Sequence, residues 1–217
     1  MIITISRELG AGGSDVARQV ADALGWRVVD NELVDQIAAR TGLSPAEVRD
    51  REERAPGFLE RLIRLLTKAA PEMLTPAAER VLELEEAKLV KITEAVVEEI
   101  AQQGRVVLVG RAAPVVLSRD RDALHLKIVA PKAARAEALM KRLGVTRDAA
   151  AAQVELSDAN RTRYHEQYYE RDWSDASHYH LVLNTAALGV DQAVATIVGR
   201  AKTLWPGETR ERRAPHP

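Results

Sequence analysis

Five short apolar runs limit the fold of this chain more than any other feature of its sequence. The runs are rich in β-branched residues, nearly continuous in apolarity and separated by helical patterns. Such runs are typical of parallel strands that helices cover on both faces. The sequence therefore predicts an α/β fold, with a five-stranded parallel sheet flanked by helices in three layers. The expected strands are 2–6, 27–30, 106–110, 125–130 and 179–184.

Helical patterns with clear end signals fill the intervals between these strands. The first helix ends at Gly25, and a second helix spans 31–40. Pro45 and Pro76 each stand at the first position of a further helix, behind a serine or threonine that caps it. The helix that Pro76 opens is expected to reach about residue 102. Its apolar stripe is expected to face the core, with a homodimer seam as the alternative; the stripe consists of Leu89, Ile92, Val96 and Ile100.

The length of 217 residues suits a single α/β domain, which we expect to span 1–205. Residues 43–75 are charged and interrupted by proline and glycine, which predicts a helical insert between the second and third strands. Residues 133–172 are dense in arginine and are expected to form a second helical region. The last segment, 206–217, is expected to be a disordered tail.

The composition excludes several classes of protein. Because it has no cysteine, the chain has no disulfide scaffold, thiolate metal site or cysteine nucleophile. The net charge of -1 gives no electrostatic case for binding a nucleic-acid polymer. No signal peptide or membrane-spanning run is visible, so a cytoplasmic protein with no membrane partner is expected. His165, His178 and His180 lack a third metal ligand at a suitable spacing, and we expect them to pack as polar residues.

The segment 6–15 lies between the first strand and the first helix and has glycine at positions 10, 12 and 13. Glycine permits positive φ and has no Cβ to obstruct a phosphate. The backbone N–H groups of such a loop, together with the positive end of the helix that follows, attract phosphate. Ser14 or Asp15 begins that helix, in a position to meet a phosphate-bound Mg²⁺. Because ligands bind at the carboxyl ends of parallel strands, we expect a phosphate-binding loop here rather than a plain tight turn.

A dinucleotide site of the Rossmann type is the competing interpretation of this loop. Such a site needs an acidic residue at the end of the second strand, and Asp30 is available there. The glycine spacing, however, does not fit the pattern G-x-G-x-x-G. An arginine-rich second half is also unusual for an enzyme that transfers hydride.

Four motifs in order give the chain a wider resemblance. ISRELGAGGSDVARQVADALG is followed by VVDNELVDQIA, then by VVLVGRA, and finally by DANRTRYHEQYY with LVLNT. Over residues 1–200 the chain resembles the cytidylate kinase-like family of the P-loop nucleoside monophosphate kinase superfamily. The resemblance implies a P-loop NTPase fold in which 43–75 is the insert that binds a nucleoside monophosphate and 133–172 is the lid. It also implies ATP and Mg²⁺ as cofactors and nucleotides as substrates.

The resemblance further implies roles for the residues that match the motifs of the family. Asp30 would end the second strand at the acceptor pocket, and Arg111 would bind the phosphate of the acceptor. Asp158 and Arg161 would contact the acceptor and the transferring phosphate, and Arg135 falls where the lid arginines of the family begin. The donor phosphates would lie on Gly10, Ala11, Gly12, Gly13, Ser14 and Asp15, with Mg²⁺ at Ser14.

Four positions depart from those motifs. Gly13 stands where an ordinary P-loop has its lysine; Ala112, Val154 and Ala159 replace an aspartate, an arginine and a serine. Removing a group that stabilises charge in phosphoryl transfer costs about 10²–10³ in rate, so another cation is expected to replace the lysine. The available cations are Arg7, inside the loop, and four arginines of the lid: Arg135, Arg142, Arg161 and Arg163.

We expect Arg161 to act in catalysis, together with Arg135 and Arg7. Arg161 and Arg163 lie two residues apart, so on a helix they face different directions, and only Arg161 matches the motif. A surface ion pair is the alternative for Arg7.

Three functions follow from these features. The first is ATP-dependent phosphoryl transfer to a nucleoside monophosphate, with CMP or dCMP as the preferred acceptor. The second is a nucleotide-binding regulatory protein that keeps the kinase fold but has little catalysis. The third is a kinase for another small acceptor, since a fold does not determine a substrate.

Overall fold

The computed structural model of the chain describes residues 1–30, 38–40, 44 and 76–207, and of residues 76–86 it describes only the backbone. The predicted second helix is therefore described only at its end, over 38–40. Most of the insert predicted over 43–75, including the helix behind Pro45, lies outside the described residues, as does the tail from residue 208.

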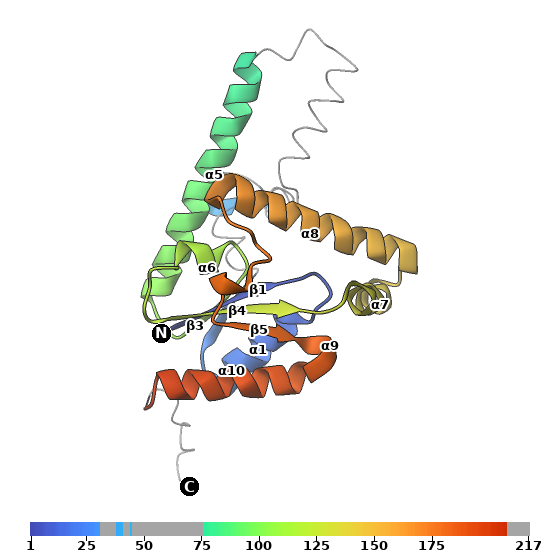
Figure 1. The fold of residues 1–217 in the computed structure, drawn as a ribbon. Coiled ribbons are helices and arrows are strands. Elements are labelled where there is room, and N and C mark those ends of the chain that lie inside the picture. The colour runs from blue at the N-terminus through green and yellow to red at the C-terminus, as the bar shows by residue number, and fades with distance from the viewer. Residues whose placement is uncertain (31–37, 41–43, 45–75, 208–217) are drawn as a thin grey trace.

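A sheet of five parallel strands forms the centre of the fold (Figure 1). The strands run in the order β2-β3-β1-β4-β5, and every neighbouring pair is parallel. The five strands predicted from the apolar runs are therefore confirmed, with ends that differ by no more than two residues. Their bounds are β1 Ile2–Arg7, β2 Arg27–Val29, β3 Val106–Val109, β4 Ala123–Val129 and β5 Leu181–Asn184.

Helices cover both faces of this sheet, as its buried strands require (Figure 1). On one face lie α1 (Gly13–Leu24) and α10 (Val190–Leu204); on the other lie α5 (Pro76–Gln102), α6 (Ala113–Val116) and α8 (Arg147–Tyr169). α7 (Lys132–Leu143) packs against α8, and the short helices η2 (Ala176–His178) and α9 (Thr185–Leu188) flank β5. None of the described helices is both long and apolar enough to cross a membrane.

The alternation of side chains along each strand divides the core between the two faces. Ile3 and Ile5 of β1 are fully buried in the layer that α1 and α10 cover. Val106 and Leu108 of β3 point to the other face, where α5 packs on them. The stripe predicted on that helix is confirmed as core: Leu89, Val96 and Ile100 are buried and Ile92 packs beside them.

The central position of β1 determines where the loops of the fold meet. β3 and β4 flank β1 and run in the same direction, so the loops that follow these three strands lie at one edge of the sheet. They lead from β1 to α1, from β3 to α6 and from β4 to α7. The predicted phosphate loop is the first of them, at the edge where open α/β sheets bind ligands.

We expect the substitution Val107→Ala to lower the free energy of unfolding by about 2–3 kcal/mol, because it removes two carbon atoms from a fully buried position. The matched control is Val182→Ala on β5, where the valine is 40% exposed and the loss should be less than half as large. Urea unfolding of both variants and the wild type gives the two values. Equal losses would contradict this description of the core.

Candidate functional site

The loop between β1 and α1 needs glycine for two reasons. Gly10 and Gly12 have φ of 84° and 74°, in the left-handed region that side chains disfavour. In addition, a Cβ at position 10 would lie 2.5 Å from the backbone oxygen of Arg135, so the loop packs directly on the first turn of α7. Backbone fixed in this way keeps its N–H groups in place at the start of α1.

Ser14, in the first turn of α1, is linked to the end of β2. Its hydroxyl donates to Oδ2 of Asp30 at 3.1 Å, while Nη2 of Arg7 lies 3.4 Å from Oδ1 of the same carboxylate. Asp30 therefore joins the cation at the end of β1 to the hydroxyl that was expected to meet Mg²⁺. Asp15 turns away to solvent and pairs with Arg18. The loop carbonyl of Ala11 accepts a hydrogen bond from Thr185 at 2.7 Å.

The turn after β3 has an unusual backbone. Gly110, Arg111 and Ala112 follow one another with φ of 78°, 57° and 50°. A left-handed conformation costs a residue other than glycine about 1–2 kcal/mol, and such cost concentrates at functional sites. The turn is held by hydrogen bonds from Gly110 N to Ile5 O and from Ala113 N to Gly110 O. It places Arg111 at the same edge of the sheet as the glycine loop.

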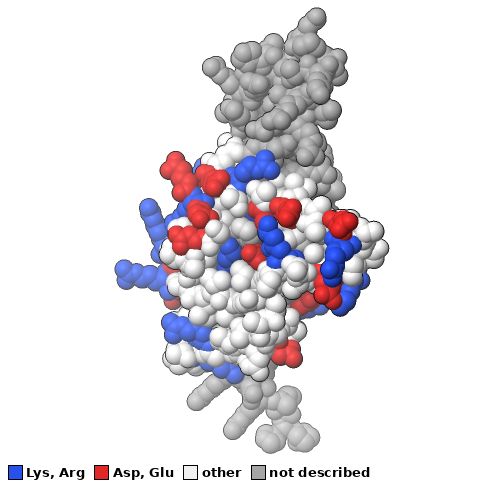
Figure 2. Space-filling model, turned by 45° about the vertical axis from the view of Figure 1, so that its right-hand side comes forward, with Lys and Arg blue, Asp and Glu red and all other residues white. Residues whose placement is uncertain are grey.

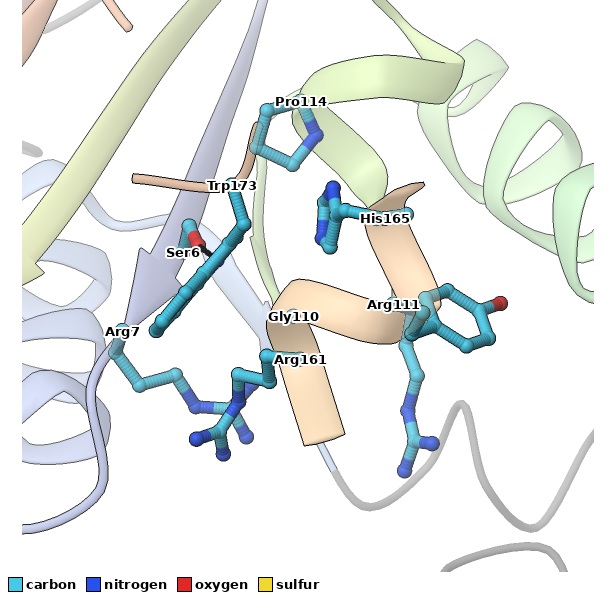
Figure 3. Close-up of a pocket in the computed structure, with 10 residues that line it drawn as sticks. Ser6, Arg7, Gly110, Arg111, Pro114, Arg161, His165 and Trp173 are labelled. Atoms are coloured by element: carbon cyan, nitrogen blue, oxygen red, sulfur yellow. Dashed lines mark hydrogen bonds between the residues drawn. The ribbon is translucent and has the colours of Figure 1, made fainter. Parts of the chain in front are cut away.

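A cavity opens at this edge, between the sheet and α8 (Figure 3). Arg7 from the end of β1, Arg111 from the strained turn and Arg161 from α8 all line it, and Figure 3 shows the three side chains extending to the same side. Three guanidinium groups around one cavity have the charge and the geometry to bind an anion with several oxygens. The remaining lining residues are Ser6, Gly110, Ala112, Pro114, Tyr164, His165 and Trp173.

Trp173, in the connection between α8 and β5, forms one wall of the cavity. Its indole N–H donates to Ser6 Oγ at 2.8 Å, and its carbonyl oxygen accepts from Lys127 Nζ at 2.7 Å. Two cations lie near the ring: Lys127 Nζ is 3.9 Å from the centroid and Arg161 Cζ is 5.8 Å away. Through these contacts Trp173 fixes the end of the arginine-rich region on the sheet, beside the glycine loop.

Two buried basic groups beside Trp173 have lowered pKa values. Burial lowers the pKa of Lys127, although Glu8 and Asp172 act in the opposite direction. Burial, helped by the charges of Lys127 and Arg161, lowers the pKa of His165 to about 4. At neutral pH His165 is therefore uncharged, and the positive charge at the cavity comes from the arginines.

Arg135 is turned into the protein. Its side chain is 3% exposed, and its two terminal nitrogens donate to both carboxylate oxygens of Asp158 at 3.0 and 2.8 Å. Nε donates to Ala130 O at 2.8 Å and lies 3.2 Å from a carboxylate oxygen of Glu8. The structure thus brings Arg135 and Asp158 together beside the glycine loop, outside the group that lines the cavity.

The structure brings only some of the residues singled out from the sequence together at the cavity. Arg7, Arg111 and Arg161 line one cavity, with Asp30 and Ser14 next to Arg7. Arg163 faces another direction than Arg161, as expected, and hydrogen-bonds within its own helix. Within the described part of the chain no three histidine or acidic side chains form a metal cluster.

Sequence reasoning missed two residues of this region. The sequence does contain an indication of Lys127, because a lysine inside the apolar run HLKIVA is unexpected for a buried strand. For Trp173, nothing local in the sequence shows that its indole reaches Ser6. On the described part of the face in Figure 2, basic and acidic side chains are interspersed.

The lowered pKa of His165 predicts a dependence of stability on pH. Between pH 6.5 and 4 the unfolded chain binds a proton at this histidine and the folded chain does not, so the free energy of unfolding falls as the pH falls. A separation of the two pKa values of this size corresponds to about 3 kcal/mol over the window. In His165→Gln the decline should be correspondingly smaller, measured by urea unfolding at a series of pH values. The control His178→Gln, at a half-exposed site, should keep the wild-type decline. Identical declines in His165→Gln and the wild type would contradict the assignment.

Comparisons with known proteins agree with this architecture. The family model described as "Cytidylate kinase-like family" matches residues 2–187. Cytidylate kinase of Halobacterium salinarum is 28% identical over 218 residues, which cover 99% of this chain and 96% of that protein. A solved structure of an uncharacterized protein from Eubacterium ventriosum has a TM-score of 0.66 at 21% identity and covers 94% of this chain and 99% of its own. Shikimate kinase from Bacteroides thetaiotaomicron has a TM-score of 0.50 at 15% identity, covering 94% of this chain and 97% of its own.

The match over residues 2–187 spans the glycine loop, the strained turn after β3 and the whole of α8. The solved structures add that the arrangement of the parallel sheet and its helices is shared with them. The chain belongs to the cytidylate kinase-like family.

Proposed function

We propose that this protein is a cytoplasmic kinase that transfers the γ-phosphoryl group of ATP to a nucleoside monophosphate, with CMP or dCMP as the preferred acceptor. One observation carries the proposal: three arginines from three separate elements line a single cavity beside the glycine loop. In a member of the cytidylate kinase-like family, an anion site of this kind suits two substrates that each bring phosphate. Residues 1–205 would form the one catalytic domain.

The donor would lie on the glycine loop. Backbone N–H groups at Gly10–Ser14 and the positive end of α1 would hold its phosphates, and the left-handed glycines give the backbone a fixed shape for this. Ser14 and Asp30 together present a hydroxyl and a carboxylate, oxygen ligands of the kind Mg²⁺ prefers. Mg²⁺ bound there would neutralise charge on the phosphates of the donor.

The acceptor would lie on the other side of the cavity. Arg111 would bind its phosphate, since the strained turn after β3 projects this side chain into the cavity. Arg161 lines the same cavity from α8 and would contact the phosphoryl group in transfer. Asp158 and Arg135 would act indirectly, because their bidentate pair holds α8 against the glycine loop. The family resemblance assigns Asp30 to the acceptor pocket; because its carboxylate accepts a hydrogen bond from Ser14, we propose that it serves the donor side instead.

Phosphoryl transfer requires that the two substrates are positioned and that the charge of their phosphates is stabilised, and it requires no general base. An oxygen of the acceptor phosphate attacks the γ-phosphorus of ATP, the bond to the β,γ-bridging oxygen breaks, and ADP leaves with that electron pair. Guanidinium groups stay protonated at any relevant pH and pair with two oxygens at once, so they stabilise the charge that spreads over the transferring group. Exclusion of water from the cavity would prevent hydrolysis of ATP.

A kinase for another small acceptor is the second candidate, and α8 supplies the observation that favours it. Val154, at a position where cytidylate kinases have an arginine, is 1% exposed and packs with Leu139 and Ala150 in a small apolar cluster. That position therefore contributes packing here instead of a charge for the acceptor. Ala159 likewise offers no hydroxyl.

A screen of acceptors tests the proposal directly. Purified protein is incubated with Mg-ATP and one nucleoside monophosphate at a time, and the formation of ADP and of the nucleoside diphosphate is followed. We expect turnover with CMP and dCMP well above the hydrolysis of ATP alone. Tight binding of ATP without turnover on any acceptor would contradict the proposal and favour the regulatory alternative. Turnover only with a different acceptor would favour the second candidate.

Arg111 gives a separate prediction. We expect Arg111→Ala to lower kcat/KM for the acceptor by about 10²–10³-fold, because a charge that binds its phosphate is lost, with little change in the affinity for ATP. The matched control is Arg119→Ala, an exposed arginine after α6, which should leave both values near those of the wild type. Steady-state kinetics and calorimetric titration with ATP give the two readouts. A loss of ATP affinity as large as the loss for the acceptor would show that Arg111 belongs to the donor side.

A further inference from the structure

The side chain of Arg7 occupies the space that any side chain at position 13 would need. A Cβ built on Gly13 lies 2.4 Å from Cβ and 2.9 Å from Cγ of Arg7, closer than atoms of this kind approach in proteins. The obstacle is the root of the arginine side chain, which cannot move aside unless the end of β1 moves with it. A side chain at position 13 and the present course of Arg7 therefore exclude each other.

Backbone conformation does not explain this glycine. Gly10 and Gly12 have positive φ. Gly13 does not have positive φ, and it is the first residue of α1. Alanine or lysine is intrinsically better than glycine in a helix by up to about 1 kcal/mol. The room that Arg7 needs is the feature of the structure that requires glycine at position 13.

The far end of Arg7 is enclosed in the same way. A Cβ at Gly110 would lie 2.0 Å from Nη1 of Arg7, so the guanidinium rests against the backbone of the turn after β3. Nη2 is directed to Asp30 at 3.4 Å. The side chain of Arg7 thus runs between Gly13 and Gly110, which belong to different loops, and its guanidinium is held by the carboxylate of Asp30.

Stability does not account for this arrangement. The side chains of Arg7 and Asp30 are 25% and 28% exposed, and an ion pair of such exposure contributes little to folding. That exposure leaves the guanidinium accessible from the cavity, which Arg7 lines together with Arg161 (Figure 3). A partly exposed guanidinium beside the start of α1 suits a ligand with phosphate oxygens.

We propose that Arg7 supplies, from the end of β1, the cation that binds the phosphates of a nucleoside triphosphate and that ordinary P-loops carry as lysine at position 13. Positions 7 and 13 would then be paired. The positive charge that ordinary P-loops carry at position 13 stands at position 7 in this protein, and position 13 is glycine. The inference rests on the proposed function to the extent that the loop binds a nucleoside triphosphate, but it does not depend on the acceptor.

A charge-swap experiment tests the pairing of the two positions. The affinity for Mg-bound adenylyl imidodiphosphate, an ATP analogue that is not hydrolysed, is measured by calorimetry for Arg7→Gly, Gly13→Lys and the double variant. Glycine is used at position 7 because the Cβ of Arg7 is itself the nearest obstacle to a side chain at position 13. Arg7→Gly should weaken binding at least about tenfold, as expected for a lost charged hydrogen bond. Gly13→Lys should also weaken binding, since it displaces Arg7. In the Arg7→Gly background, however, the same lysine should strengthen binding at least about fivefold, because its space is now empty.

Two further variants keep the result interpretable. Arg200→Ala, an exposed arginine on α10, is the control for loss of one positive charge and should bind like the wild type. If Gly13→Lys does not fold, as judged by circular dichroism, Gly13→Ala makes the same comparison. Its Cβ alone should weaken binding when Arg7 is present and should have no effect after Arg7→Gly, which removes the Cβ that it would meet.

The outcomes separate this inference from the proposed function. Wild-type affinity in Arg7→Gly, equal effects of Gly13→Lys in both backgrounds, or a wild type that does not bind the analogue would overturn the inference. If the swap behaves as expected and no nucleoside monophosphate is phosphorylated, the proposed function fails and the inference stands.

Discussion

The buried guanidinium of Arg135 is the contact on which the geometry of the site depends. It joins four parts of the chain: the carboxylate of Glu8 before the glycines, the carbonyl of Leu9, the end of β4 at Ala130, and Asp158 of α8. The backbone of Gly10 packs on Arg135 itself. A buried charge must keep its partners, because removing one of them typically costs about 3–5 kcal/mol. The glycine loop and α8, which carries Arg161, are therefore held in one arrangement and cannot shift independently.

This contact also bears on what the residues around it do. For Arg135 or Asp158 to bind a substrate directly, their bidentate pair would first have to separate, at the cost of two charged hydrogen bonds to a buried guanidinium. Arg161 hydrogen-bonds Ser157 of its own helix and already extends into the cavity (Figure 3). Under the proposed function, the buried pair would set the distance between the loop and α8, and the arginines of the cavity would bind the phosphates.

Those parts of the fold that follow from local patterns could be predicted from the sequence. The five strands, the long helix ending at Gln102 and the glycine loop are each determined by periodicity, caps or turn residues within about 30 positions. The contacts that shape the site are of another kind. Trp173 and Ser6 are 167 residues apart, and only the folded sheet brings them together. Nor could spacing show that Arg135 turns inward while Arg161 faces the cavity, because both lie in arginine-rich helical sequence; the direction is set by the acids that happen to lie opposite.

Gly13 shows why comparing motifs position by position is incomplete when the requirement is electrostatic. The energy of interaction between a cation and phosphate oxygens depends on the distance between them and on the polarity of the surroundings. It does not depend on which position of the sequence carries the cation. Arginine is long enough to come from a strand end, but its planar fork needs a defined direction, which the carboxylate of Asp30 provides. Such a side chain must also pass close to other backbone: its root leaves no room for a Cβ at position 13, and its guanidinium lies against Gly110, whose positive φ itself favours glycine. The glycine loop and the turn after β3, separate motifs along the sequence, are thereby coupled through one arginine, and a change in either is felt by the other.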